Sequence, residues 1–327
     1  MTAAREGRRP IVAALYREAF PPRLDEVEEF AEVRLTKADG LAKAMDGADV
    51  LYQWHSFSPA LKENWVAASS LKWVHVSAAG VSQLMFDELV ASEVTYTNSR
   101  GVLSRAIAEF ALGFVLDLAK DAQGSFKLQQ QQRWQHRTTR KVQGQSALVV
   151  GTGSIGREIA RLFRAVGMEV DGAARTGRPR DADFGLIYPS RELSRIVRYY
   201  DYVVLAAPLT QETMGLVDAK VLGAMKPSAS LINVGRGQLV QTDALVDALE
   251  SGSIAAAALD VVDPEPLPEG HALWEMENVI ITPHMCGDTV DYLDDLGKLF
   301  VDNLKRYCNG EPLQNIVDKS LGYVPGH

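Results

Sequence analysis

The feature that most constrains the fold of this chain is a glycine-rich turn between an apolar strand and an amphipathic helix. The apolar run Ala147–Val150 leads directly into the sequence GTGSIG, residues 151–156, and the stretch that follows carries apolar residues at helical spacing as far as Val166. In this strand-to-helix context, such a turn is typical of a dinucleotide-binding α/β unit. A glycine turn with a purely structural role is the alternative.

Each residue of the turn has a separate expected role. Gly151 allows the tight bend, Gly153 leaves room for a pyrophosphate to approach the backbone, and Gly156 lets the helix pack closely on the strand. Ser154 and Ile155 begin the helix, where free N–H groups and the helix dipole hold phosphates. We therefore expect these five residues to bind the cofactor.

The choice of dinucleotide depends on the end of the next strand. An acidic residue there binds the ribose 2′-hydroxyl of NAD. Asp171 lies at about the right distance along the chain, but strand alternation places it in mid-strand and puts Ala174 at the tip. Arg175, Thr176 and Arg178 follow directly, and guanidinium groups favour an anionic 2′-phosphate. NADP(H) is therefore the preferred expectation, with NAD(H) possible; a solvated basic loop is the alternative.

Length and strand pattern predict two α/β domains built on doubly wound parallel sheets. The chain has 327 residues, 46% of them hydrophobic and 23% charged, which is enough apolar material for two cores. In the first hundred residues, strands alternate with helical stretches. The four strands expected there are Ile11–Tyr16, Asp49–Trp54, Leu71–Val76 and Val94–Asn98. The six expected after Ser146 are Ala147–Val150, Glu169–Ala173, Tyr202–Ala206, Leu231–Val234, Ala255–Leu259 and Val279–Ile281.

Helical segments flank the second set of strands. Ser104–Lys120 is predicted to be a long apolar helix, and Val290–Tyr307 a last helix with no strand after it. That last helix could pack back on the first domain. Between them, Gln123–Lys141 is polar, rich in glutamine and carries one tryptophan. A solvated surface segment and a dimer contact both fit this composition.

Composition excludes several classes of partner. The formal net charge of −8 argues against a nucleic-acid surface. No stretch approaches the roughly 20 apolar residues that a membrane span needs. With only two cysteines, a disulfide framework is not expected, and a reducing compartment, the cytoplasm, is the simpler expectation. The histidines show no metal-ligand spacing.

Three further segments place polar side chains just beyond apolar strands, where ligands bind an open α/β sheet. They contain Arg236 in INVGRGQLV, Asp260 and Glu265 in the stretch 257–268, and His284 in IITPHM. Each has an ordinary explanation by itself: a surface turn, a rigid proline loop or a helix cap. Their joint occurrence downstream of a dinucleotide turn favours a catalytic set.

With these segments in place, the chain resembles the D-isomer-specific 2-hydroxyacid dehydrogenase family, and within it the glyoxylate/hydroxypyruvate reductases most. The stretches that carry the resemblance are GTGSIG, Ala206–Thr210, Asn233–Gly237, Ala257–Pro268 and Thr282–His284, in family order and spacing. The first domain matches more loosely, through VHVSAAGV, TNSRGV and Ala106–Leu112.

The resemblance implies an NAD(P)-dependent oxidoreductase that moves a hydride between nicotinamide and a small 2-keto or 2-hydroxy acid. Arg236 would hold the substrate's carboxylate and 2-oxo group. His284 would be the acid–base, and Glu265 would fix the imidazole tautomer and favour its charged form. A cation and a proton donor lower the barrier because hydride delivery develops negative charge on the carbonyl oxygen.

The family also implies contacts around these groups. Asp260 would face the nicotinamide carboxamide, and Pro208, Thr213 and Val234 would complete the cofactor site. Gly80 and Val81 would offer backbone N–H groups to the substrate carboxylate. Trp54 either shapes the substrate pocket or is ordinary core.

The same resemblance implies a domain arrangement. Residues 1–103 plus 290–327 would form a discontinuous, flavodoxin-like substrate domain, and residues 104–289 the Rossmann domain. The active site would lie in the cleft between the two. An arm at about 119–143 would make a homodimer.

Some positions depart from the family pattern. Ser82 stands where the family often has Asp, and Met285-Cys286 follow the histidine in place of small apolar residues. Cys286 is interpreted as a packing residue, with a modifiable thiol as the alternative. His55 is interpreted as solvated or hydrogen-bonded and not as a second catalyst. A formate dehydrogenase would carry Gln where this chain has Glu265.

Phosphoglycerate dehydrogenase activity stays open at this stage. From another class, a dinucleotide-sensing corepressor scaffold without significant turnover is the alternative function. Long Pro/Ser-rich extensions, which usually accompany scaffolding, are not apparent in the sequence.

Overall fold

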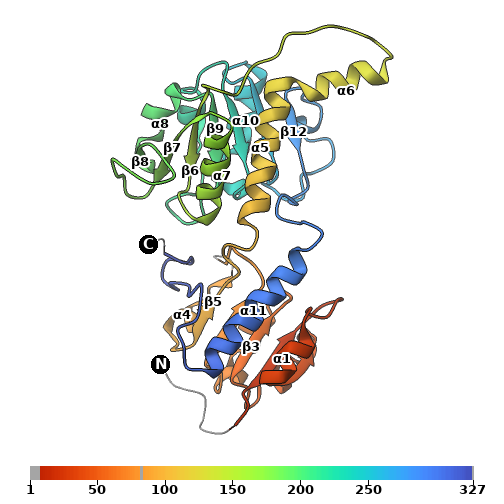
Figure 1. Ribbon diagram of the computed structural model, residues 1–327, viewed down its shortest axis with the longest axis vertical. Coiled ribbons are helices and arrows are strands. Elements are labelled where there is room, and N and C mark those ends of the chain that lie inside the picture. Colours follow the sequence, from red (N-terminus) through yellow and green to blue (C-terminus); the bar gives the residue numbers. More distant parts are fainter. Residues whose placement is uncertain (1–7, 82–83, 326–327) are drawn as a thin grey trace. The chain divides into compact units, whose positions relative to one another are not determined.

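The computed structural model describes residues 8–81 and 84–325 of the chain. It divides into two compact units, Met1–Leu103 with Thr289–His327, and Ser104–Asp288 (Figure 1). We refer to them as the first and the second unit. Within the described ranges, no helix is both long and apolar enough to cross a bilayer.

The first unit is a five-stranded parallel sheet with the strand order β2-β1-β3-β4-β5. The helix that completes it, α11 (Tyr292–Cys308), comes from the far end of the chain. The strands are β1 (Ile11–Leu15), β2 (Glu32–Thr36), β3 (Val50–Gln53), β4 (Trp73–Val76) and β5 (Thr95–Thr97). The other helices are α1 (Leu24–Phe30), α2 (Leu41–Met45), α3 (Ala60–Glu63) and α4 (Asp87–Ala91), with 3₁₀ turns at Ala38–Gly40 and Trp65–Ala68.

Strand alternation explains why both faces of this sheet are buried. In β1, Ile11, Ala13 and Leu15 enter one apolar cluster, whereas Val12 and Ala14 enter the other, which contains residues of α11. On the α11 face the ring of Phe300 stacks on that of Tyr52, with centroids 3.7 Å apart. Helix α11 is thus part of the core of the first unit.

A fully buried histidine lies within this core. Nδ1 of His75 is 2.8 Å from Oγ1 of Thr97, and that oxygen also accepts a hydrogen bond of 2.8 Å from Nε1 of Trp73. Thr97 therefore has its own proton to donate to His75. Burial lowers the pKa of His75 to about 3. This histidine is neutral and structural.

The second unit contains a seven-stranded parallel sheet in the order β12-β11-β10-β9-β6-β7-β8. Its strands are β6 (Ser146–Val150), β7 (Glu169–Ala174), β8 (Ile187–Pro189), β9 (Tyr202–Leu205), β10 (Ser230–Asn233), β11 (Ala256–Leu259) and β12 (Val279–Ile281). Its helices are α5 (Ser104–Lys120), α6 (Ala122–Gln130), α7 (Ser154–Ala165), α8 (Leu193–Ile196), α9 (Ala219–Leu222) and α10 (Thr242–Glu250). Short 3₁₀ turns lie at Ser190–Glu192, Val197–Tyr199, Gly237–Leu239 and Ala272–Trp274.

The predicted fold class, two parallel α/β sheets, is confirmed, but each sheet has one strand more than we expected. Strand β2 was missing from the four predicted first, and β8 from the six predicted later. Both are edge strands, and β8 has only three residues, the last of them a proline. Such short, partly exposed strands leave a weak apolar pattern.

The strand order fixes where a ligand can bind in the second unit. From β6 the chain adds β7 and β8 on one side, then returns to place β9 on the other side of β6. This reversal is a topological switch point, and ligands of open α/β sheets bind beyond the carboxyl ends of the strands there. The glycine-rich turn follows β6 at that place.

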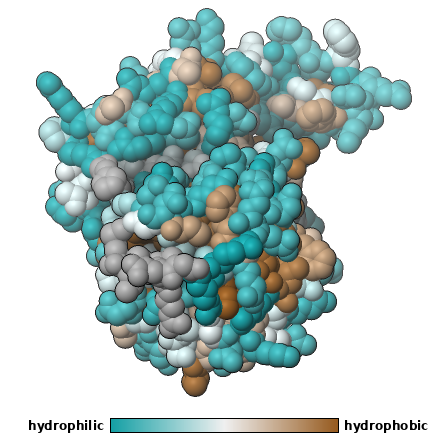
Figure 2. Space-filling model, turned by 60° about the horizontal axis from the view of Figure 1, so that its bottom comes forward, coloured by the Kyte–Doolittle hydropathy of each residue, from teal (hydrophilic) through white to brown (hydrophobic). Residues whose placement is uncertain are grey.

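A polar arm extends from the second unit. Helix α6 has no buried residue and extends away from the rest of the unit in Figure 1. The chain after it runs without regular structure to residue 142 and returns to the unit, where the Arg140 N–H donates to the Ala119 carbonyl at 3.0 Å. Trp134 is fully exposed, and Phe126 is 64% exposed. The face drawn in Figure 2 is mainly hydrophilic, with apolar residues in smaller patches. A fully exposed tryptophan is unusual in a folded protein, because tryptophan is highly buried on average.

Candidate functional site

The three glycines of the turn differ in whether the surrounding protein leaves room for a side chain. Gly151 has φ 105°, and a Cβ there would lie 2.6 Å from the backbone of Ala206. A Cβ on Gly156 would lie 1.9 Å from the carbonyl oxygen of Gly151. A Cβ on Gly153 would meet nothing within 4 Å. Packing thus explains two of the three glycines, and open space lies over the third.

That open space fits a dinucleotide pyrophosphate. Helix α7 begins at Ser154, so the N–H groups of its first turn, including that of Ile155, have no partner within the helix. A phosphate placed above Gly153 would accept from them and would meet the positive end of the helix dipole. The donor set and the cradle therefore suit the group that the sequence motif implies.

The other predicted cofactor residues follow the neighbouring strands β9 and β10. Oγ1 of Thr213 donates to the carbonyl of Pro208 at 2.7 Å, which closes the loop after β9. Val234 comes directly after β10, is 4% exposed, and its N–H donates to the carbonyl of Leu205 at 3.1 Å. Both segments lie beyond the same carboxyl edge as the glycine turn.

The carboxylate of Asp171 is already engaged in hydrogen bonds within the second unit. Its carboxylate accepts hydrogen bonds of 2.6 Å from both the Leu186 N–H and the Tyr200 hydroxyl. Ala174 is the last residue of β7, as the sequence indicated. The carboxylate of Asp171 therefore holds β8 and the following helical segment against β7.

Basic residues surround a shallow pocket beyond β7. Its volume is about 470 Å³, and its lining includes the predicted Arg175, Thr176 and Arg178. Arg191 and Tyr188 also line it, and sequence analysis missed both. Arg191 lies 13 positions after Arg178, so no local motif connects them.

The turn that carries Arg236 is built by its neighbours. The side chain of Asn233 donates to the Arg236 carbonyl at 2.9 Å and accepts from the Gly235 N–H at 3.1 Å. A Cβ on Gly237 would lie 1.8 Å from the carbonyl oxygen of Val262, so only glycine fits there. The NVGRG sequence therefore fixes the backbone on both sides of the arginine.

Arg236 itself is partly buried, and a buried cation acts more strongly on a neighbouring charge. Burial lowers the pKa of its guanidinium, and the nearby Glu265 and Cys286 oppose that shift by Coulomb attraction. Arginine stays protonated at neutral pH despite such a shift. Its Nη1 donates to the Gly235 carbonyl at 2.7 Å, which leaves most of its donors unused.

His284 and Glu265 form a direct pair. Nδ1 of His284 lies 2.6 Å from Oε1 of Glu265, with the side chains 44% and 39% exposed. A carboxylate accepts only, so Nδ1 carries the proton of this bond and Nε2 is left available. His284 also has φ 52°, and its N–H donates to the Asp260 carbonyl at 2.8 Å. The imidazole is therefore oriented from two directions.

Asp260 organises the segment that carries His284, a role that sequence analysis did not foresee. Its side chain is buried and accepts from the Thr282 hydroxyl at 2.5 Å, the Met285 N–H at 3.0 Å and the Cys286 N–H at 3.1 Å. These bonds hold the chain on both sides of the histidine. Cys286 is buried, and burial raises the pKa of its thiol, which fits a packing residue.

Apart from Arg236, the predicted substrate residues belong to the first unit. Trp54 and His55 follow β3 and are partly buried; Gly80 and Val81 follow β4, and Val81 is 1% exposed. Trp54 packs against the α11-side cluster, as its alternative interpretation as core requires. Ser82 lies outside the described residues.

No cluster of three or more His, Cys, Asp or Glu that could hold a metal ion occurs within residues 8–81 and 84–325.

Comparison with known proteins gives a consistent result. Residues 112–286 match the family model for D-isomer specific 2-hydroxyacid dehydrogenase, NAD binding domain. A glyoxylate reductase of Thermococcus kodakarensis is 32% identical over 305 residues, which cover 90% of this chain and 91% of the relative.

Solved structures agree. A D-isomer specific 2-hydroxyacid dehydrogenase family protein of Aeromonas salmonicida has a TM-score of 0.81 and 31% identity, over 95% of this chain and all of that one. A D-isomer specific 2-hydroxyacid dehydrogenase of Xanthobacter autotrophicus, in complex with NADPH and MES, has a TM-score of 0.81 and 29% identity, over 96% of this chain and all of that one.

Proposed function

Since the chain belongs to the D-isomer specific 2-hydroxyacid dehydrogenase family, we propose that it reduces a small 2-keto acid of the glyoxylate or hydroxypyruvate type with NADP(H), and that Arg236, Glu265 and His284 carry the reaction. The chain is an NAD(P)-dependent oxidoreductase of this family. The substrate, the cofactor preference and the residue roles are our proposal.

The observation that carries the proposal is the 2.6 Å bond between His284 and Glu265. Because Glu265 holds Nδ1, Nε2 of His284 is the atom that exchanges a proton with substrate. In reduction it gives a proton to the carbonyl oxygen, and in oxidation it takes the proton from the hydroxyl. Glu265 keeps one tautomer of the imidazole in place.

Arg236 binds the substrate's carboxylate and draws negative charge onto the 2-oxo group. Its fork of N–H donors matches a carboxylate and an adjacent oxygen. The turn around it is fixed by Asn233 and Gly237, so little reorganisation is needed as charge develops on the substrate oxygen. Trp54, Gly80 and Val81 of the first unit stay predictions for the remaining substrate contacts.

The glycine turn, with Ser154 and Ile155, binds the pyrophosphate of the cofactor. The loop after β7 binds its ribose. When bound, the nicotinamide supplies or accepts the hydride. Pro208, Thr213, Val234 and Asp260 remain proposed contacts around it. NADP(H) is the preferred form. This preference is supported by the exposed Arg175, Thr176 and Arg178, and by the bonds that already occupy Asp171.

We also propose a homodimer formed through the arm at 119–143. The support is the exposed Trp134 and Phe126 on a segment without a buried residue in its helix. A reducing compartment such as the cytoplasm agrees with two cysteines that are both free. The alternative of a corepressor-like scaffold is not supported, since the named relatives are reductases and dehydrogenases.

The test is the initial rate of NADPH or NADH oxidation at 340 nm with glyoxylate, hydroxypyruvate, pyruvate, phenylpyruvate and 2-ketoisocaproate. We expect turnover of glyoxylate and hydroxypyruvate, with NADPH preferred. His284→Ala should lower kcat by about 10²- to 10⁴-fold, the range for a lost general acid–base. His55→Ala is the matched control and should keep its rate. Turnover that survives in His284→Ala would refute the proposed roles.

A further inference from the structure

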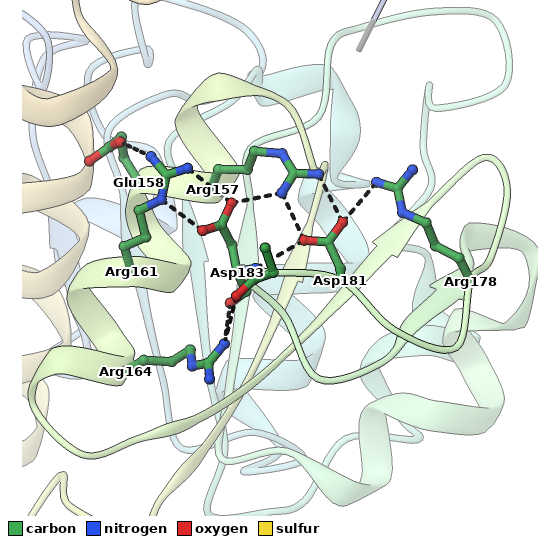
Figure 3. Close-up of polar contacts among 8 residues, drawn as sticks. Arg157, Glu158, Arg161, Arg164, Arg178, Asp181 and Asp183 are labelled. Carbon is green, nitrogen blue, oxygen red and sulfur yellow. Dashed lines mark hydrogen bonds and ion pairs between the residues drawn. The ribbon is translucent and has the colours of Figure 1, made fainter. Parts of the chain in front are cut away.

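Two aspartates of the loop between β7 and β8 are bound by arginines of helix α7 (Figure 3). Arg157 donates to Asp181 through both terminal nitrogens, at 2.7 and 2.9 Å, and to Asp183 at 2.7 Å. Arg161 donates to Asp183 through Nε at 2.7 Å and Nη2 at 3.0 Å. Helix α7 is the helix that begins at the glycine-rich turn. The network therefore ties the loop to the pyrophosphate end of the proposed cofactor site.

Both carboxylates are well shielded. The Asp181 side chain is 8% exposed and the Asp183 side chain 12%. The hydrogen bond from Arg157 holds the pKa of the Asp181 carboxyl well below its usual range, and the bond from Arg161 lowers the pKa of Asp183. Each is thus a fixed, ionised acceptor.

Of these two aspartates, only Asp181 contacts a residue that lines the basic pocket. Its Oδ2 lies 3.3 Å from Nη2 of Arg178. The backbone of Arg178 is held as well, because its N–H donates to the Ile187 carbonyl at 2.8 Å and its carbonyl accepts from the Ile187 N–H at 3.0 Å. Arg178 is thus fixed both at its backbone and at its guanidinium, and its side chain, which lines the pocket, is 46% exposed.

We propose that Asp181 is a positioning residue for cofactor selection: anchored by Arg157, it presets the guanidinium of Arg178 to receive the 2′-phosphate of an NADP-type cofactor. This inference rests on the proposed NADP(H) preference. Asp181 does not touch the phosphate itself. Ordering an arginine in advance removes the cost of immobilising that side chain on binding.

A carboxylate near a phosphate site could instead repel the ligand. Here, however, the bidentate bond from Arg157 offsets the charge of Asp181, so its field in the pocket is weak. The pocket also keeps Arg175 and Arg191 in its lining. Position, and not charge, is therefore the contribution that we assign to Asp181.

Asp183 provides the matched control. It carries the same charge, lies two residues away, and its side chain is held by two arginines of the same helix. Among the bonds drawn in Figure 3, however, none joins it to Arg178. Asp183→Asn removes a similar anchor of the loop. A loss that follows from loop stability or net charge alone would appear in both variants.

The experiment measures binding to the full-length protein by calorimetry, with adenosine 2′,5′-bisphosphate as the probe and 5′-AMP as the reference ligand. Wild type should bind the bisphosphate more tightly than 5′-AMP. Asp181→Asn should weaken bisphosphate binding about three- to tenfold, the cost of immobilising one arginine side chain, and leave 5′-AMP binding unchanged. In an Arg178→Gln background, Asp181→Asn should have no further effect. Circular dichroism verifies that each variant is folded.

The outcomes separate this inference from the proposed function. Unchanged or tighter bisphosphate binding by Asp181→Asn would overturn the positioning role. So would an equal loss for both ligands, or the same selective loss in Asp183→Asn. If wild type bound both ligands equally, the NADP(H) proposal would fail and this inference with it. If wild type discriminated and Asp181→Asn had no effect, the NADP(H) proposal would stand alone.

Discussion

Gly153→Ala should separate folding from cofactor binding in the glycine-rich turn. Gly153 has φ −77°, which alanine adopts freely, and its Cβ would meet no atom within 4 Å. At an N-cap, alanine stabilises the helix less than glycine does, by less than about 1 kcal/mol. Against this, alanine restricts the unfolded chain, which raises the free energy of unfolding by about 0.4–1 kcal/mol. The two effects nearly cancel, so thermal stability without cofactor should change little.

Cofactor binding should change much more. The added methyl group would occupy the space over the turn where we place the pyrophosphate. Forcing one such group into a closely packed contact costs about 1–3 kcal/mol, or roughly a 5- to 150-fold weaker affinity. The dissociation constant of NADPH, measured by its fluorescence on titration with protein, tests this directly.

Gly156→Ala is the opposite case and serves as the comparison. Its Cβ would lie 1.9 Å from the Gly151 carbonyl oxygen, so helix α7 must shift on the strand even without ligand. We expect a lower melting temperature for this variant. The reasoning is refuted if Gly153→Ala binds NADPH as tightly as wild type, or if it loses as much stability as Gly156→Ala.

Three further predictions concern other parts of the molecule. An unfolded histidine titrates near pH 6.5 and His75 in the fold near 3, so the fold loses stability as pH falls through this window, by about 1.4 kcal/mol per unit. Urea denaturation at pH 6.5 and 5 should show a decline about 1.6 kcal/mol smaller in His75→Gln; equal declines would contradict the buried neutral state. Burial raises the pKa of the thiols of Cys286 and Cys308, so iodoacetamide should label the native protein slowly at pH 7.5 and quickly in guanidinium; fast native labelling would exclude the packing role. Trp134→Ala with Phe126→Ala should shift sedimentation toward the monomer without lowering kcat; an unchanged dimer would mean that the arm is not the interface.

Sequence periodicity predicted the buried strands well, because strands covered on both faces are almost entirely apolar. Strand β6 is an example, with four of its five residues buried. Strand β2, with the sequence EVRLT, has one buried residue and lies at the sheet edge. Its residues alternate between polar and apolar, but it contains no apolar run of the kind that marks the buried strands, and the prediction missed it.

The candidate site was predictable as far as it follows strand ends. Arg236 and His284 each come just after an apolar strand, so counting along the chain places them at one edge of the sheet. The bonds that organise the site were not predictable in this way. Asp260 acts through backbone N–H groups 25 and 26 residues later, and Asp181 through an arginine 24 residues earlier. Such contacts depend on how loops return to helices, which no local pattern encodes.

The first unit is built from two separate stretches of the chain, and this affects the order in which its parts are synthesised. The side chain of Phe300, which stacks on Tyr52, belongs to a helix that leaves the ribosome only after the whole of Ser104–Asp288 has been made. At ordinary translation rates this takes roughly 10–40 s. Over that time the face of the first sheet that α11 packs on is covered only in part, by α1, whereas the second unit is continuous and emerges complete. The core of the first unit can therefore close only after the second unit has been synthesised.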